Sequence, residues 1–197
     1  MPSIDIDWLR NNLKNKNVNK DYPVFIETGT FMGGTIIPLE KHFNELHTIE
    51  IKEEFFVNVK NKYNRSKHNE KKKINFHLGD SSKVLDKLCP KIQNNAIFFL
   101  DGHWSAGNTG KGDKDCPLYE ELQCIMSHHK HNSIVIIDDC RLFCKGPNKK
   151  NEEHSKCDWE DINTQKILHL VDSRMDKYYF APSKLHKKDR LIIYFNK

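Results

Sequence analysis

Residues 97–104 read IFFLDGHW and residues 134–139 read IVIIDD, so two short apolar runs each end abruptly in acid. Runs of four or five β-branched and aromatic residues are typical of strands that are buried on both faces of a parallel sheet. Ligands bind such sheets at the carboxyl ends of the strands. We therefore expect three carboxylates and an imidazole to meet at one edge of the sheet: Asp101, His103, Asp138 and Asp139.

Strands and helices alternate around these two runs. The expected strands cover residues 24–27, 46–50, 74–78, 96–100, 133–137, 177–180 and 190–195. The expected helices cover residues 5–13, 34–43, 52–63, 81–88, 117–129 and 159–171. Regular alternation of this kind predicts an α/β protein with a parallel, doubly wound sheet.

The composition is that of a globular protein. The chain has 197 residues, of which 37% are hydrophobic and 30% charged. We expect one domain, 1–197, in which residues 1–21 form an N-terminal helix and a polar linker. No apolar run approaches the roughly 18 residues that a membrane helix needs. The acidic N-terminus has no apolar segment of the secretory type, so the sequence predicts a cytoplasmic protein without a membrane partner.

The formal net charge is +5, and much of it lies in lysines at 71–73 and 187–188. A basic groove for nucleic acid is one interpretation of such charge. Aromatic residues are not interleaved with the lysines, however, which favours solvated loop charge.

Six cysteines occur in the chain, and we expect free thiols because no export signal is present. Four residues could instead form a tetrahedral zinc site. They are Cys140, Cys144, His154 and Cys157. Their spacing fits no standard zinc finger closely, so simple burial of the thiols remains the alternative.

A glycine turn points to a cofactor. Residues 27–34 read ETGTFMGG, and they follow the first strand and open a helix. Glycines there let the backbone come close to a ligand. Glu50 ends the second strand about 20 residues later, and an acid at that distance hydrogen-bonds ribose hydroxyls in nucleotide sites. Residues 79–81, Gly-Asp-Ser, would reach an adenine edge, so the pattern predicts a cofactor with an adenosine half.

The glycine spacing and the charge of the turn distinguish between NAD and S-adenosylmethionine, two cofactors that contain adenosine. A dinucleotide site wants G-x-G-x-x-G, whereas this turn has Gly29-x3-Gly33-Gly34. Glu27 stands just before the turn, where a carboxylate would repel a pyrophosphate but would suit an ammonium group. These features argue against NAD and favour S-adenosylmethionine, a cation without phosphates. The predicted cofactor residues are Glu27, Gly29, Thr30, Gly33, Gly34, Glu50, Asp80, Ser81 and Asp101.

In these features, from about residue 22 to residue 197, the chain resembles the class I S-adenosylmethionine-dependent methyltransferases. The resemblance is carried by the glycine turn, by Glu50, by residues 79–81 and by a C-terminal strand pair within 177–195. It implies a Rossmann-like, doubly wound, seven-stranded sheet. Such a sheet is mostly parallel, with an antiparallel last strand and helices on both faces.

The strand ends LDGHW and IIDD resemble more narrowly the metal-dependent sugar O-methyltransferases of the macrocin type. That resemblance implies that Asp101, Asp138 and Asp139 hold Mg²⁺ or another hard divalent cation, that His103 is the general base, and that the acceptor is a hydroxyl of a sugar or glycan. The chemistry is consistent, since Mg²⁺ prefers oxygen ligands and a bound hydroxyl loses its proton more easily. A neutral imidazole within reach can take that proton.

Each of these residues also has a structural interpretation. Asp101 could turn the chain after its strand, and Asp138 with Asp139 could cap a following helix. His103 could be a metal ligand or a loop residue. The glycine- and lysine-rich segment 105–116 could be a lid over acceptor and metal, or a surface loop that makes no contact with them.

Three other functions compete with this one. An O-methyltransferase acting on a catechol-like small diol would need the same three carboxylates. A nucleic-acid methyltransferase would use the positive charge, but the Asn-Pro-Pro-Tyr motif of base amino-methylation is absent, so we do not expect nucleic acid as a partner. A non-catalytic binding module would have no need to keep His103 beside the acids. The sequence leaves the oligomeric state open, a homo-oligomer included.

Overall fold

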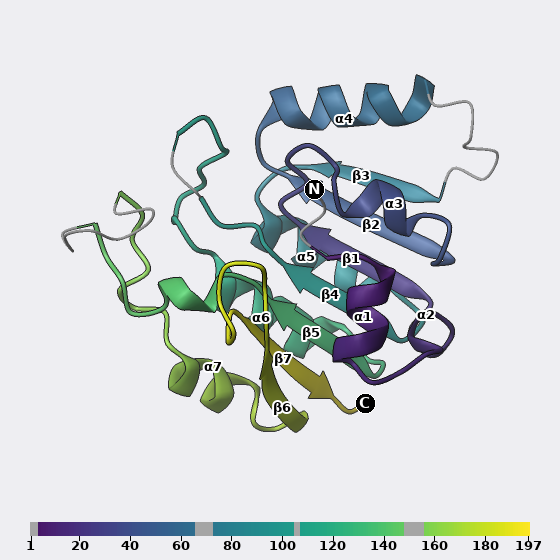
Figure 1. Cartoon of the computed structure of the whole chain (residues 1–197). Coiled ribbons are helices and arrows are strands. Elements are labelled where there is room, and N and C mark those ends of the chain that lie inside the picture. The colour runs from purple at the N-terminus through teal and green to yellow at the C-terminus, as the bar shows by residue number, and fades with distance from the viewer. Residues whose placement is uncertain (1–3, 66–72, 105–106, 148–155) are drawn as a thin grey trace.

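The computed structural model describes residues 4–65, 73–104, 107–147 and 156–197 (Figure 1). In this part of the chain, seven strands form one sheet in the order β3-β2-β1-β4-β5-β7-β6. The strands are β1 (Val24–Thr28), β2 (Glu45–Glu50), β3 (Ile74–Leu78), β4 (Ala96–Leu100), β5 (Ser133–Ile137), β6 (Met175–Ala181) and β7 (Arg190–Phe195). Strands β1 to β5 pair in parallel, and β7 is antiparallel to both of its neighbours. The predicted fold class is thereby confirmed.

Helices cover both faces of the sheet. They are α1 (Ile6–Asn12), α2 (Val18–Asp21), α3 (Ile36–Leu39), α4 (Glu53–Arg65), α5 (Ser81–Leu88), α6 (Leu118–His128) and α7 (Thr164–Val171). Figure 1 shows α1 in front of the central strands and α5 and α6 behind them. Side chains of α1 to α4 pack on one face, and side chains of α5, α6 and α7 pack on the other.

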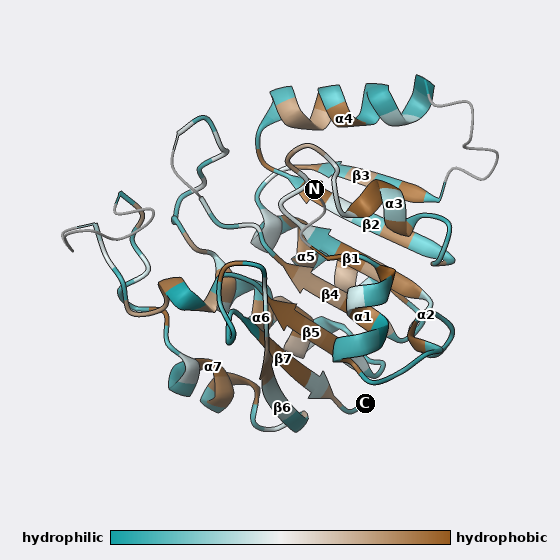
Figure 2. Cartoon of the chain, viewed as in Figure 1, coloured by the Kyte–Doolittle hydropathy of each residue, from teal (hydrophilic) through white to brown (hydrophobic). Residues whose placement is uncertain are grey.

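The centre of the sheet is buried and mostly apolar. Every residue of β4 and of β5 is buried, and these strands form the brown centre of Figure 2. In the sheet register, Thr28 pairs with Leu100, and Leu100 pairs with Ile137. The three strands therefore end at the same level, and the residues that follow them begin one common edge of the sheet.

Three helix predictions need correction. The helix after β1 covers only Ile36–Leu39 rather than 34–43, because Pro38 has no N–H to donate and the chain then returns to the sheet through a bond from Asn44 N to Pro23 O (3.0 Å). Residues 18–21 form a short helix within the segment expected to be a linker, and they bury Val18.

The last helix begins at Thr164, five residues later than expected. Trp159 N donates to Lys145 O and Cys144 N donates to Ile162 O, so residues 159–162 are bonded to the loop after β5 instead of to a helix. The side chain of Asn163 accepts from Lys166 N and begins the helix there.

Among the described residues, none of the helices combines the length and the apolar character that crossing a membrane requires.

Candidate active site

The edge where the strands end has a crevice between β1 and β4, because the strand order reverses there. Ligands of doubly wound sheets bind at such a point. The loops after the two strands are in contact: Asp101 N donates to Thr28 O (3.3 Å), and a Cβ on Gly29 would lie 2.3 Å from Asp101 O. Gly29 also has φ +83°, a conformation that glycine adopts without strain. The glycine turn is therefore fitted directly against the first predicted acid.

A cavity of about 320 Å³ opens at this crevice. That volume is in the range of small-molecule sites. Five of the predicted cofactor residues line it: Gly29, Glu50, Asp80, Ser81 and Asp101. The cavity continues to His103, so the cofactor end and the chemical end of the predicted site share one space.

Glu50 is held in place by backbone donors. Its Oε2 accepts from Phe31 N and its Oε1 accepts from Lys52 N, each at 2.8 Å. A carboxylate has about four acceptor positions, so two remain for a ligand. Two vicinal hydroxyls, as on a ribose, match this arrangement.

Of the apolar walls of the cavity, only Trp104 was considered from the sequence, as a pocket wall or as a cover of the sheet edge. Phe31 and Phe55 meet edge to face with ring centroids 4.9 Å apart, and both line the cavity together with Ile51 and Trp104. Scattered aromatic and aliphatic residues in loops and helix ends carry no sequence signal that separates a pocket wall from core.

The segment 105–116, interpreted either as a lid over acceptor and metal or as a loop without contact, lines the cofactor end of the cavity instead. Residues 105 and 106 are outside the described residues, and the rest of the loop contributes Thr109, Gly110, Gly112 and Lys114 to the cavity wall. Lys52 Nζ donates to the backbone and side-chain oxygens of Asn108, which fastens the loop to the start of α4. The loop therefore covers the side of the cavity next to Glu50.

Four predicted cofactor residues are not among the residues that line the cavity: Glu27, Thr30, Gly33 and Gly34. Glu27 is buried beneath the turn, where its Oε2 accepts from Thr48 Oγ1 (2.9 Å). Thr48 Oγ1 in turn lies 2.6 Å from Thr30 Oγ1. These side chains hold the turn in shape from below. A direct contact between Glu27 and a cofactor stays a prediction.

The buried carboxyl group of Glu27 has a consequence for stability. Burial raises the pKa of Glu27 to about 8 from an ordinary value of 4.5. Between these values the folded protein keeps a proton that the unfolded chain releases, so stability falls as pH rises, by at most about 1.4 kcal/mol per pH unit. Glu27→Gln removes this loss. Its free energy of unfolding should therefore exceed that of the wild type by an amount that grows from about pH 5 to pH 8.

Urea unfolding at several pH values measures the difference. The exposed Glu53→Gln is the control, and it should keep the slope of the wild type. Parallel curves for wild type and Glu27→Gln would show that Glu27 is ionised in the folded protein across this range.

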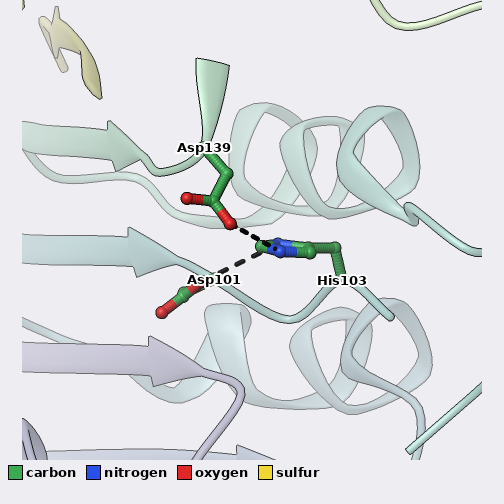
Figure 3. Close-up of side chains that lie close together, drawn as sticks. All are labelled: Asp101, His103 and Asp139. Atoms are coloured by element: carbon green, nitrogen blue, oxygen red, sulfur yellow. Dashed lines mark ion pairs between the residues drawn. The ribbon is translucent and has the colours of Figure 1, made fainter. Parts of the chain in front are cut away.

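At the chemical end, His103 lies between two acids (Figure 3). Its Nε2 is 2.9 Å from Asp139 Oδ2, and its Nδ1 is 3.7 Å from Asp101 Oδ1. The His103 side chain is only 5% exposed. Asp139 has φ +58°, a conformation that aspartate tolerates better than most residues, and this turn of the chain directs its carboxylate to the imidazole. The predicted meeting of residues from two strand ends is found for these three side chains.

The fourth residue, Asp138, is directed elsewhere. Its two oxygens lie 3.0 Å from Nε and 3.3 Å from Nη2 of Arg190, and both side chains are buried. Arg141 pairs with Asp139 and also, at 2.9 Å, with the buried Asp189. Two arginines thus balance part of the negative charge at this edge of the sheet.

The pKa values of Asp101 and Asp139 are shifted in opposite directions. Burial and the neighbouring carboxylates of Asp138, Asp139 and Glu27 raise the pKa of Asp101 well above its usual range. Burial also acts to raise the pKa of Asp139, but contacts with His103 and Arg141 outweigh it and leave that pKa below its usual range. A cation bound beside Asp101 would relieve the repulsion that its ionisation meets.

The donor set fits a hard divalent cation. Oxygens of Asp101 and Asp139 and a nitrogen of His103 lie within 4.8 Å of one another. Asp138 belongs to a second group of this kind, with Asp139 and Asp189. Both of its oxygens contact Arg190, and Oδ1 also accepts from Asp139 N (3.0 Å), so a metal would have to share Asp138 with these donors.

The cysteine cluster does not gather in the part of the chain that the structure describes. Cys140, Cys144 and Cys157 do not bring their sulfur atoms within the distance of a shared metal, and His154 lies outside the described residues. Each of the six thiols is free of disulfide bonds, as expected.

The comparisons with known proteins concern the fold. No protein-family model and no curated protein matches the sequence. Solved structures do match. The O-methyltransferase TomG from Streptomyces achromogenes, which is involved in tomaymycin synthesis and was solved with S-adenosylmethionine, has a TM-score of 0.60 and 13% identity over 90% of this chain and 74% of its own.

Two further structures were solved with S-adenosylhomocysteine. An O-methyltransferase from Bacillus cereus has a TM-score of 0.61 and 14% identity, with 91% of this chain and 77% of that chain covered. The methyltransferase PaMTH1 from Podospora anserina has a TM-score of 0.61 and 14% identity, with 98% and 76% covered. Together with the strand order and the crevice at β1 and β4, these matches identify the architecture: this chain has the fold of the class I S-adenosylmethionine-dependent O-methyltransferases.

Proposed function

We propose that the protein is an S-adenosylmethionine-dependent O-methyltransferase that acts, with Mg²⁺ or another hard divalent cation, on a hydroxyl of a sugar or glycan. One observation carries the proposal. A single cavity joins Glu50, with two acceptor positions left for a diol, to Asp101 and His103 at the end of β4. A nucleoside held at one end would have its reactive group at the other. The sugar acceptor itself rests on the resemblance of residues 100–104 and 136–139 to the macrocin type.

The charge of the cavity favours a cationic cofactor. Three acids, Glu50, Asp80 and Asp101, line it, against one lysine, Lys114, which pairs with Glu120. A pyrophosphate would meet more acids than cations here, whereas a sulfonium and an ammonium group are complementary to the acids. S-adenosylmethionine carries both cations and no phosphate. The neighbours solved with S-adenosylmethionine or S-adenosylhomocysteine support the same choice.

His103 is the proposed general base. When bound, S-adenosylmethionine supplies the methyl carbon, and a divalent cation held by Asp101, Asp139 and Asp138 makes the acceptor hydroxyl more acidic. His103 takes the hydroxyl proton on a ring nitrogen as the oxygen–carbon bond forms and the carbon–sulfur bond breaks. Asp139, 2.9 Å from Nε2, stabilises the imidazolium that results. The loop 107–115 and the aromatic wall line the cofactor end.

Ligand binding tests the cofactor without an acceptor. S-adenosylmethionine and S-adenosylhomocysteine should raise the melting temperature, and NAD should not; a ligand at one hundred times its Kd adds about 2.7 kcal/mol to the free energy of unfolding. Measurements with Mg²⁺ and with a chelator show whether the cation contributes. Stabilisation by NAD and not by S-adenosylmethionine would contradict the proposal.

Methyl transfer from isotopically labelled S-adenosylmethionine then tests the chemistry. Monosaccharides, nucleotide sugars and glycans form the main acceptor panel, and a catechol and an RNA represent the competing functions. His103→Asn should lower kcat by about 10²–10⁴-fold, because the base is lost, while the Kd for S-adenosylhomocysteine stays close to that of the wild type. The exposed His169→Asn is the matched control. Equal turnover by the two variants would remove His103 from the mechanism.

A further inference from the structure

Behind the imidazole of His103 lies a second, much smaller cavity. It has about 10 Å³ of space, and its lining includes Gly102, His103, Glu121 and Trp159. Space of this size is about what one water molecule needs. Gly102 and His103 line the large cavity as well, so the imidazole ring forms part of the wall between the two cavities.

Three buried polar atoms belong to residues that line this small cavity, and none has a hydrogen-bond partner among the described residues. They are His103 Nε2, Glu121 Oε1 and Trp159 Nε1. Their side chains are almost completely buried, at 5%, 2% and 2% exposed. Asp139 Oδ2 forms an ion-pair contact with Nε2 at 2.9 Å, and Nε2 has no further hydrogen-bond partner among the described residues. Buried polar groups without partners are uncommon and call for an explanation.

Glu121 is a carboxylate from the inner face of α6. Hydroxyls of Ser81 and Thr28 donate to it, which fixes the group below the strand ends. A Cβ on Gly102 would lie 3.1 Å from its Oε1, so glycine at that position leaves this oxygen uncovered. Burial raises the pKa of Glu121 to about 7, and the neighbouring His103 acts in the opposite direction.

From these contacts we infer that the small cavity is a binding site for one water molecule, through which Glu121 orients the imidazole of His103. The hydrogen bonds balance in one arrangement. Trp159 Nε1–H can only donate, the Glu121 carboxylate accepts, and Asp139 near Nε2 favours a proton on that nitrogen. The water accepts from Trp159 and from His103 Nε2–H, and it donates to Glu121 Oε1.

This arrangement fixes the tautomer of His103. With the proton on Nε2, the lone pair is on Nδ1, the nitrogen 3.7 Å from Asp101 on the side of the large cavity. Glu121 is thus a positioning residue, and its role in methyl transfer rests on the proposed function. The water site and the tautomer do not depend on it, and they can be observed in the protein without ligands.

A high-resolution crystal structure and ¹⁵N NMR of the histidine side chains test the inference. The crystal structure should show one water bonded to Glu121, Trp159 and His103, and the NMR spectrum should show His103 protonated at Nε2. Glu121→Met removes the acceptor, so the water should be lost and the Nε2 resonance should move toward the unprotonated range. Glu121→Gln keeps an oxygen at this position and should restore the wild-type spectrum. Asp86→Asn, an exposed acid on α5, is the control.

Trp159→Phe provides a second variant that keeps the ring but removes the donor. It should weaken the water site and shift the same resonance in the same direction. A dry cavity in the wild type, or an unchanged His103 tautomer in both Glu121→Met and Trp159→Phe, would overturn the inference. Binding of S-adenosylhomocysteine to the wild type is a separate measurement. If the wild type does not bind this ligand, the proposed function is contradicted, but the inference about the water site is not.

Discussion

Gly29→Ala is expected to abolish detectable binding of S-adenosylhomocysteine and to lower the free energy of unfolding by about 3–5 kcal/mol. Two effects add. The backbone of Gly29 has φ +83°, which an L side chain adopts only under strain. The new Cβ would also lie 2.3 Å from Asp101 O and 2.9 Å from Asp101 C, which are backbone atoms that cannot rotate away. The loops after β1 and β4 would have to separate, and they form the floor of the cavity.

Gly107→Ala separates the two effects. Gly107 also has a positive φ, +60°, but nothing lies within 4 Å of the position of its Cβ. This variant should cost only the strain of the backbone, about 1–2 kcal/mol, and should still bind the ligand. Urea unfolding and isothermal titration calorimetry measure both quantities. If the two variants unfold and bind alike, the close approach of Gly29 to Asp101 does not shape the cavity.

The strands could be predicted because their sequence pattern is local. Residues 96–100 and 134–137 are uninterrupted apolar runs with turn residues at each end, and both lie in fully buried parallel strands. The helix at 34–43 could not be bounded in the same way, since its end is set by a bond from Asn44 to Pro23 in another part of the fold. Residues 159–162 likewise bond to the loop after β5, although their apolar spacing is that of a helix.

In the candidate site, too, some residues could be predicted from the local sequence and others could not. Asp101 directly follows β4 and Asp139 is the second residue after β5, so the rule that parallel strands end at one edge predicted that they would meet with His103. Glu121 reaches the site from a helix face whose pattern is that of an ordinary amphipathic helix. Its spacing of three residues from Leu118 and four from Ile125 places it on the apolar face of α6, but only the packing of α6 behind β4 shows where it points.

Arg190 is the residue whose role depends most on long-range pairing. Ile137 pairs with Leu191 across β5 and β7, so Asp138 and Arg190 are opposite each other at the next position. The two residues are 52 positions apart in the sequence, and their side chains are both 5% exposed. The guanidinium also lies 4.6 Å from the ring of Trp8 on α1, which brings the N-terminal helix into contact with this pair.

Removal of this guanidinium is expected to lower the free energy of unfolding strongly. Arg190→Met keeps a long side chain against Trp8 but leaves Asp138 buried without its cation, beside Asp101 and Asp139. Loss of one partner of a buried ion pair costs about 3–5 kcal/mol, because the remaining charge is neither solvated nor paired. Thermal and urea unfolding should show a loss of this size.

The double variant distinguishes an ion pair from simple packing. Adding Asp138→Asn to Arg190→Met removes the orphaned charge, and replacing both partners of a buried pair is often close to neutral. The double variant should therefore be more stable than Arg190→Met alone, with a coupling free energy in the range of about 0.5–3 kcal/mol for residues in contact. Additive losses would mean that Arg190 acts through its contact with Trp8 and not through its charge.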